Sequence, residues 1–271
     1  ALWPQLPTTL LQGEVQATPP APGATPWQLA IALRNSAAGP WDYGQLPVSG
    51  LNLQAEATAE QLAIQRLTLQ VGGGSLSGQG QWSLARSSGR AELTLQELPL
   101  HGLHTLLAPR LASGRISLGT ASKPRTSAGA DSNTHIEVAI RTAPTGKPSP
   151  GRTAADKAAA RAPGSRLAIE SITATGDWNG HSLQLQQVDL RAAGARLQGQ
   201  GSVQPQPFST QGQWRVAAPG LDSVITGSVS AQAGNGQLSV NASKLAQVHQ
   251  WLRSLPLPSD MTLPSWPLDG D

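Results

Sequence analysis

The 271-residue chain has no cysteine, and it has only one Phe, one Tyr and one Met. The absence of cysteine excludes a scaffold held together by disulfides. With so few Phe and Tyr, order has to come from Leu, Val, Ile and Ala side chains spread thinly along the chain. No uninterrupted apolar run reaches the roughly 18 residues of a membrane-spanning helix. The composition therefore favours an extended fold with a thin hydrophobic core.

Charged residues are scarce as well, at 13% of the chain, with a net charge of +3. The basic residues gather between about Ser122 and Arg166, in stretches rich in Ala, Pro, Gly and Ser. Elsewhere acids and bases nearly balance, and no basic stripe with interleaved aromatics is present, which argues against a nucleic-acid partner. Stretches of this composition bury too little apolar surface to become ordered. We expect a disordered basic insertion at residues 120–166, with one possible strand at His135–Arg141.

What the chain does have is an internal repeat. Residues Leu62–Trp82 read LAIQRLTLQVGGGSLSGQGQW, and residues Leu183–Val203 read LQLQQVDLRAAGARLQGQGSV. At one offset, apolar and glycine positions coincide: Leu67 with Val188, Leu69 with Leu190, Gly73 with Gly194, and Leu76 with Leu197. Both copies have the pattern of a strand, a glycine break and a second strand. Such repeats build elongated sheets, and they favour a binding surface over a catalytic centre.

Apolar and polar residues alternate through most of the chain, which is typical of strands with one apolar and one polar face. The pattern predicts an all-β fold: an elongated, curved antiparallel sheet, shaped like a trough and wet on one face. About fifteen strands at roughly 4.8 Å would give a length on the order of 70 Å. We divide the chain into a first β segment at residues 1–119, the insertion at residues 120–166, and a second β segment at residues 167–271 that ends in a short helix and a Pro-rich tail.

Two stretches have helical spacing instead of alternation. The first contains Leu103, Leu106 and Leu107 and stops at Pro109. The second is SKLAQVHQWLRSLP, with Ser243 as its expected N-cap. Its apolar stripe consists of Leu245, Val248, Leu252 and Leu255. We expect short helices at both places, covering an end or edge of the sheet so that it does not pair uncontrollably.

No pattern in the chain predicts catalysis. The glycine-rich stretch Gly72–Gly80 lacks the Lys-Ser/Thr ending of a phosphate-binding loop. Leu76 stands where a nucleophile elbow needs a serine. His101 and His104 have no Cys, Asp or Glu nearby to complete a metal site, so we expect both to face solvent. We therefore expect a protein that is not an enzyme and that uses no metal and no cofactor.

Tryptophan is the one aromatic residue present in number, with eight copies. Trp82 and Trp214 share the local text QGQW. On a sheet face, a tryptophan either packs in an apolar layer with its N–H at the wet rim or stacks on a sugar ring. The apolar layer is the favoured interpretation. The alternative, a carbohydrate-binding module, requires the two side chains to lie side by side on an exposed, flat face.

Residues Leu10–Gly119 resemble a known family. In order along the chain they contain LLQGEV, WQLAIAL, AAGPWDYGQLPV and GGGSLSGQGQW, and the repeat from Leu167 onward matches more loosely. This order is similar to that in the translocation and assembly module subunit TamB and the wider AsmA-like family of Gram-negative bacteria. The basic stretch Thr120–Ser165 lies outside the pattern.

The resemblance implies a long periplasmic protein that is anchored in the inner membrane and reaches the outer membrane. It implies phospholipid transport, outer-membrane biogenesis and protein assembly together with an outer-membrane barrel partner, TamA. Neither an anchor nor a partner-binding domain is recognisable here, so we expect an interior piece whose contact with TamA lies in other parts of the protein.

Alternation and resemblance both lead to a lipid conduit. A long apolar face needs either curvature or a ligand to cover it, and phospholipid acyl chains would fill a trough of this kind. From the alternation we expect nine leucines to line it: Leu67, Leu69, Leu76, Leu93, Leu95, Leu183, Leu185, Leu190 and Leu197. The main alternative is a structural or adhesive β-solenoid, which would seal its apolar residues in a closed core.

Overall fold

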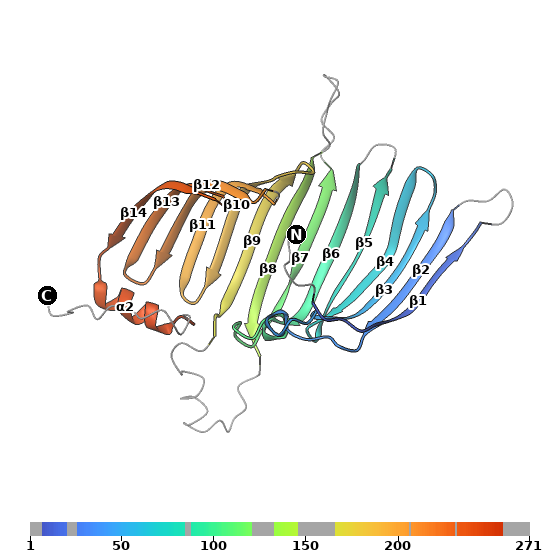
Figure 1. Cartoon of the computed structure of the whole chain (residues 1–271), viewed down its shortest axis with the longest axis horizontal. Helices are drawn as coiled ribbons and strands as arrows, with labels where there is room; N and C mark the ends of the chain where they lie inside the picture. Colours follow the sequence, from blue (N-terminus) through green and yellow to red (C-terminus); the bar gives the residue numbers. More distant parts are fainter. Residues whose placement is uncertain are drawn as a thin grey trace, which may run out of the picture.

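The computed structural model describes residues 7–20, 26–84, 88–120, 133–145, 166–205, 207–230 and 232–256. They form one open, curved sheet of fourteen strands, and each strand pairs antiparallel with its neighbours in the chain (Figure 1). This confirms the all-β fold and the curved antiparallel sheet expected from the alternating pattern. At roughly 4.8 Å per strand, the sheet is about 60 Å long.

The strands follow one another across the sheet in chain order. The first seven are β1 (Leu11–Thr18), β2 (Trp27–Asn35), β3 (Val48–Ala57), β4 (Gln61–Val71), β5 (Gly74–Ser83), β6 (Ser88–Pro99) and β7 (Arg110–Thr120). The others are β8 (Thr134–Pro144), β9 (Ile169–Trp178), β10 (Leu183–Ala192), β11 (Ala195–Gln204), β12 (Ser209–Ala218), β13 (Leu221–Ser230) and β14 (Gly234–Ala242). Strand β8 is the one expected at His135–Arg141, and it joins β7 to β9 without a break. The disorder expected at residues 121–132 and 146–165 concerns segments outside the described residues.

The register carries apolar residues straight across the sheet, because directly paired residues share a face. One row, which we call the central apolar row, has a member in each strand: Val15, Ile31, Leu53, Leu67, Gly78, Leu93, Ile116, Val138, Ala174, Val188, Gly199, Trp214, Ile225 and Leu238. The second apolar row lies two residues along each strand: Gly13, Leu33, Leu51, Leu69, Leu76, Leu95, Gly114, Ile140, Ile172, Leu190, Leu197, Val216, Ser223 and Val240. One face of the sheet is therefore apolar from β1 to β14.

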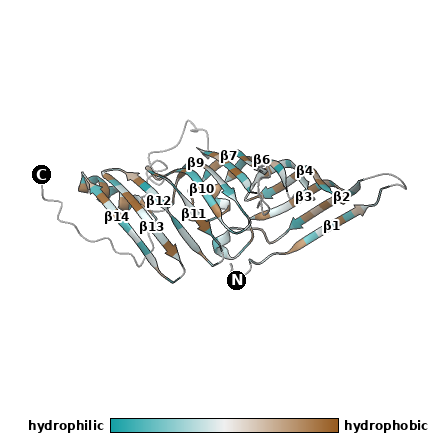
Figure 2. Cartoon of the chain, turned by 90° about the horizontal axis from the view of Figure 1, so that it is seen from above, coloured by the Kyte–Doolittle hydropathy of each residue, from teal (hydrophilic) through white to brown (hydrophobic). Residues whose placement is uncertain are grey.

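The residues between these two rows point to the opposite face, which we call the polar face. Their row reads Glu14, Ala32, Asn52, Thr68, Ser77, Thr94, Arg115, Ala139, Thr173, Asp189, Gln198, Arg215, Val224 and Ser239. Figure 2 shows the same alternation as brown and teal residues that succeed one another along the strands. The period of two seen in the sequence is thus the period of the pleat.

The register shifts at several places in the sheet, and two of these places are β-bulges that lie one in each copy of the repeat. In β4 the register shifts between Ile64 and Leu67, and in β10 it shifts between Leu185 and Val188. Each bulge inserts one extra residue, so the apolar residues on both sides of it still point to the same face. The two bulges occupy equivalent positions of the repeat, which therefore preserves an irregularity of the backbone as well as the apolar pattern.

Helical elements cover one long edge of the sheet, the lower edge in Figure 1. They are η1 (Trp41–Tyr43), η2 (Leu100–Gly102) and α2 (Leu245–Ser254). Helix α2 docks on the turns of two hairpins. The indole N–H of Trp251 donates to the carbonyl of Ala193 at 2.9 Å, and buried Val248 lies beside Gly220. The expectation that helical segments cover an edge is confirmed for α2.

At the first expected helix, the structure has a 3-10 turn followed by other turns, and no α-helix. Leu103, Leu106 and Leu107 follow a single 3-10 turn and lie in hydrogen-bonded turns, with Leu106 exposed. A residue distant in sequence holds this segment in place, because Thr105 donates to the Asp42 carboxylate through both its N–H and its hydroxyl. At the other site, the N-cap of α2 is Lys244, which makes no side-chain capping hydrogen bond, so the expected N-cap Ser243 lies one residue too early.

The only buried cluster of the described residues lies under η2, at this capped edge. It consists of Leu95, Leu98, Leu100 and Ala112, with partly buried residues such as Val71 and Ile140 against it. Contacts between strands run along the chain order, and none of the described residues forms a second layer over the apolar face. The sheet is thus a single layer with one closed edge.

Candidate functional site

The register brings all nine predicted leucines onto the apolar face. Leu67 and Leu93 belong to the central apolar row. The second apolar row contains Leu69, Leu76, Leu95, Leu190 and Leu197. In β10, Leu185 pairs with Gly176 and Gly201, and Leu183 pairs with Trp178 and Val203 on the same face. The nine side chains thus extend from β4 to β11 along a single surface.

Eight of these leucines are half-buried, which is the exposure of side chains that have lateral neighbours and no covering layer. Leu95 differs, since it is only 7% exposed and packs in the cluster under η2. Leu95 therefore supports the closed edge, while the other eight are accessible from the apolar side. Its burial depends on the covering segment after β6, which alternation within β6 does not reveal.

Sequence reasoning missed more than half of the apolar face. The missed members of the central apolar row are Val15, Ile31, Leu53, Ile116, Val138, Val188, Trp214, Ile225 and Leu238. Alternation was visible within their strands, but which residues face one another depends on turn lengths and bulges. The apolar surface consequently reaches both ends of the sheet, where Val15 is 70% and Leu238 is 65% exposed.

Strand glycines indicate that the sheet curves toward its apolar side. On this face, a Cβ placed on most strand glycines would lie within 3 Å of the neighbouring strand, a distance real Cβ atoms do not reach; among them are Gly13, Gly78, Gly114, Gly176, Gly199, Gly201, Gly212, Gly227 and Gly236. On the polar face, Gly50 has 3.6 Å of clearance and Gly119 meets nothing within 4 Å. Glycines and bulges are the usual devices that curve a sheet. We conclude that the apolar face is the concave one.

Trp82 and Trp214 both lie on the apolar face, each over the glycine paired with it on the next strand. A Cβ on Gly199 would come within 2.5 Å of the indole of Trp214, and Gly89 is covered in the same way by Trp82. The two tryptophans lie on β12 and β5, with six strands between them. The side-by-side arrangement that a carbohydrate-binding module requires is therefore wrong for this pair.

The closed core expected for a β-solenoid is not seen in the described residues. Successive strands are antiparallel neighbours in one layer, whereas a solenoid stacks its coils around an interior. Only six apolar residues of the described chain are buried: Ala55, Leu95, Leu98, Leu100, Ala112 and Val248.

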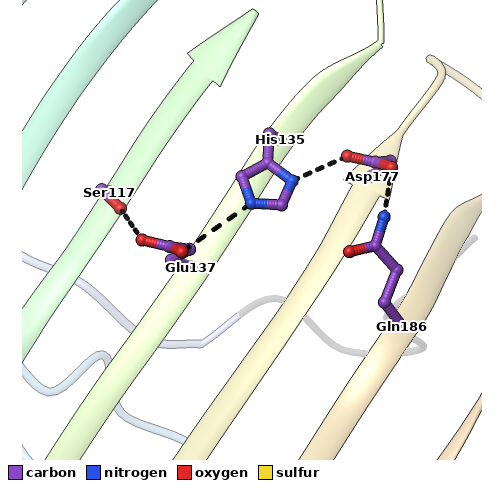
Figure 3. A network of polar contacts seen from close by, with 5 residues as sticks. All are labelled: Ser117, His135, Glu137, Asp177 and Gln186. Atoms are coloured by element: carbon purple, nitrogen blue, oxygen red, sulfur yellow. Dashed lines mark hydrogen bonds and ion pairs between the residues drawn. The ribbon is translucent and has the colours of Figure 1, made fainter. Parts of the chain in front are cut away.

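The polar face carries a hydrogen-bonded network in its middle (Figure 3). The imidazole of His135 lies between two carboxylates, with Nδ1 2.8 Å from Asp177 Oδ1 and Nε2 3.9 Å from Glu137 Oε1. Gln186, the extra residue of the β10 bulge, donates to Asp177 at 2.6 Å, and the Ser117 hydroxyl donates to Glu137 at 3.3 Å. The hydroxyl contacts a carboxylate and not the imidazole, so the network lacks the contact through which histidine activates a serine nucleophile. It ties β7, β8, β9 and β10 together.

Among the described residues, three carboxylates have pKa values below their ordinary value. Hydrogen bonds from the guanidinium of Arg196 lower the pKa of Asp189, and those from Arg215 lower the pKa of Asp222. Each of these pairs crosses one hairpin on the polar face, with Nε–O distances of 3.0 Å. Thr105 lowers the pKa of Asp42 through its hydroxyl hydrogen bond.

The expectation that both histidines of the capped edge face solvent holds for His101 and fails for His104. His101 is exposed, but His104 is half-buried, and its Nδ1 accepts the N–H of Leu106 at 3.2 Å. The same nitrogen is 3.8 Å from Asp42. Because Asp42 also accepts both hydrogen bonds from Thr105, these side chains tie η1 to the segment after η2.

Hollows of about 350 to 550 Å³ lie along the polar face, between Gln, Arg and Ser side chains. They are open gaps between long polar side chains, and the described residues hold no group of three His, Asp or Glu arranged to bind a metal ion. In the same part of the chain, no helix has the length and apolar character to cross a bilayer. The extended feature of this molecule is therefore its apolar face.

Searches for similar proteins find no matching family model, no matching curated protein and no matching solved structure.

Proposed function

We propose that this chain is a non-enzymatic segment of a lipid conduit, in which phospholipid acyl chains lie along the concave apolar face. The observation that carries the proposal is the central apolar row, which crosses all fourteen strands with no covering layer from the part of the chain that the structure describes. Head groups would remain in water at the uncapped long edge, opposite η2 and α2. No bond is made or broken in this function.

The size of the apolar face supports the proposal. The apolar rows are about 60 Å long and take up some 20 Å of each strand. The apolar face therefore has an area on the order of 1,000 Å². Soluble proteins seldom expose contiguous apolar patches above a few hundred Å². Acyl chains would shield this surface at about 25 cal/mol per Å². Because such contacts have no direction, lipid would slide between equivalent positions, and no single leucine would be indispensable.

We further propose the setting that the TamB and AsmA-like resemblance implies. In it, the chain belongs to a periplasmic protein that is anchored in the inner membrane and links it to the outer membrane. Its role there would be phospholipid transport and outer-membrane biogenesis, including protein assembly with TamA through other parts of the protein. The geometry that supports this setting is an elongated sheet whose apolar face continues from β1 to β14.

The test is lipid capture by the purified chain, measured by native mass spectrometry after exposure to phospholipid vesicles. We expect bound phospholipid on the wild type and its loss in Leu69→Arg, which places a charge in the second apolar row. Thr68→Arg is the matched control, because the neighbouring side chain points to the polar face. Both variants should keep a β-rich circular dichroism spectrum. A folded wild-type chain that captures no lipid, or equal capture by both variants, would contradict the conduit and favour a scaffold.

A further inference from the structure

One row of the apolar face lies beside the uncapped long edge, at the upper hairpin turns in Figure 1. We call it the rim row, and it lies about four residues from the central apolar row along each strand. Its members pair across neighbouring strands: Trp27, Ala57, Leu62, Trp82 and Gly89, then Thr120, Thr134, Trp178, Leu183, Val203, Thr210, Val229 and Gly234. Hydrogen bonds between Thr120 and Gly89 join the two parts. Of the four tryptophans in the described strands, only Trp214 lies outside this row.

The three rim tryptophans are accessible to a ligand. Trp27 is 48% and Trp82 is 37% exposed, and Trp178 is half-buried. Within the described residues, none of their indole N–H groups has a hydrogen-bond acceptor, whereas that of Trp251 donates to Ala193. A ligand that covers such a ring has to supply an acceptor, because an unpaired N–H shielded from water is costly. The rings therefore suit a ligand that is apolar on one side and polar on the other.

The rim row marks the boundary between the apolar face and water. Beyond it, two hairpin turns carry exposed polar residues: Thr58, Glu60, Asn179 and His181. In the other direction, the apolar rows continue to the buried cluster under η2, against which Leu76 packs. Trp82 and Leu76 are six residues apart on β5, which is about 20 Å. An acyl chain in one leaflet of a bilayer spans roughly 15 Å, so it fits between the rim row and the closed edge.

We propose that the three rim tryptophans hold phospholipid by its ester linkages, with each indole N–H donating to an ester carbonyl. This inference rests on the lipid conduit proposed above, and it adds where the lipid is held and how it is oriented. The ester carbonyls are the first acceptors above the acyl chains. A lipid whose chains run along the strands toward η2 therefore presents them at the rim row. Tryptophan occupies the same level in bilayers, between the acyl chains and the head groups.

The spacing of the three tryptophans gives the path of the lipid discrete positions. Trp27 is on β2, Trp82 on β5 and Trp178 on β9, so they lie three and four strands apart. At the usual strand spacing these separations are about 14 and 19 Å. Lipid would thus pass from one tryptophan to the next along the uncapped edge.

Removal of the ester carbonyls from the lipid tests the hydrogen bonds. The purified chain is exposed to vesicles with equal amounts of a diacyl phosphatidylethanolamine and its dialkyl ether analogue, and captured lipid is measured by native mass spectrometry. The wild type should capture the diacyl lipid in about three- to tenfold excess, which is the effect of one hydrogen bond. The triple variant Trp27→Phe, Trp82→Phe and Trp178→Phe should lose this excess and still capture lipid. Trp214→Phe is the matched control on the same face and should keep the excess.

Fluorescence quenching gives a second, independent measurement. Phospholipids brominated near the ester or near the methyl end of the chain quench the indoles beside them. The difference between the wild type and Trp82→Phe gives the rim signal. The difference between the wild type and Trp214→Phe gives the signal of the central apolar row, about 13 Å deeper. Trp82 should be quenched more strongly by bromine near the ester, and Trp214 by bromine near the methyl end.

The outcomes separate this inference from the conduit itself. A folded chain that captures no lipid overturns both. Captured lipid without an ester preference, or a preference that persists in the triple variant, overturns only the role of the rim tryptophans. Identical or reversed quenching profiles of Trp82 and Trp214 overturn the orientation and leave the conduit in place.

Discussion

The indole of Trp214 lies over the backbone of Gly199, its direct partner across the β11–β12 ladder. A Cβ at Gly199 would approach Cε3 of Trp214 to 2.5 Å and would press on the carbonyl of Gln213. The glycine thus lets the large ring lie flat on the concave face instead of projecting from it. Aromatic side chains commonly cover strand glycines in this way.

Gly199→Ala should therefore lower the free energy of unfolding by about 1–3 kcal/mol, because ring and strand must move apart. Gly119→Ala is the matched control on the polar face, where the new methyl meets nothing within 4 Å. It should be neutral or stabilising by up to about 1 kcal/mol. Urea unfolding followed by circular dichroism measures both values. Equal destabilisation by the two substitutions would contradict the close approach on the apolar side.

The two bulges make a prediction about deletions. Removing Gln186 restores a regular ladder in β10 and keeps Leu185 and Val188 on one face. It should cost only the hydrogen bond to Asp177, about 0.5–1.5 kcal/mol. Removing Gln198 from regular β11 turns Leu197 to the polar face, which should cost at least about 2 kcal/mol. Thermal unfolding of the two deletion variants gives the comparison, and a larger loss for the Gln186 deletion would refute this account of the bulge.

The two hairpin ion pairs predict a dependence of stability on acid. Arg196 and Arg215 hold the pKa values of Asp189 and Asp222 below their ordinary value of 3.8. The unfolded carboxyls bind protons first as the pH falls, so this stabilisation is complete above pH 3.8 and is lost below it. The thermal midpoint should thus decline on acidification through this range.

A double variant, Asp189→Asn with Asp222→Asn, tests that dependence. It should be less stable than the wild type near neutral pH, and its midpoint should decline less below pH 3.8. Differential scanning calorimetry at a series of pH values provides the measurement. Parallel curves for the two proteins would show that these pairs do not contribute.

The docking of α2 rests on Trp251 and Val248. Trp251→Phe keeps an aromatic ring but removes the N–H that bonds to the Ala193 carbonyl, which should weaken docking by about 0.5–1.5 kcal/mol. Amide hydrogen exchange in α2 should then quicken about three- to tenfold, while exchange in the middle strands stays unchanged. Gln250→Ala, at an exposed position of the same helix, is the control and should leave exchange nearly as it is.

Alternation predicted the strands and the shared face of the nine leucines, because a period of two follows from the pleat whatever pairs with a strand. It predicted α2 for a similar reason, since the stripe through Leu245 and Val248 needs a helix to become continuous. It did not predict that Leu95 is buried or that the segment around Leu106 is not helical. The burial of Leu95 depends on how the segment after β6 folds over it. The conformation around Leu106 depends on a contact distant in sequence, that of Thr105 with Asp42. The register depended on bulges at Gln65 and Gln186, which no composition rule marks.

The order of the strands in space repeats their order in the chain, and this has a mechanical consequence. A force applied to the two ends would separate the strand ladders one hairpin after another, because each described strand pairs only with its neighbours in the chain, and the long-range contacts of Asp42 with Thr105 and of Trp251 with Ala193 lie outside these ladders. By the same logic, evolution can lengthen such a molecule by duplicating hairpins, each of which adds about 10 Å without redesign of the rest. The length of the sheet is then set by its number of hairpins.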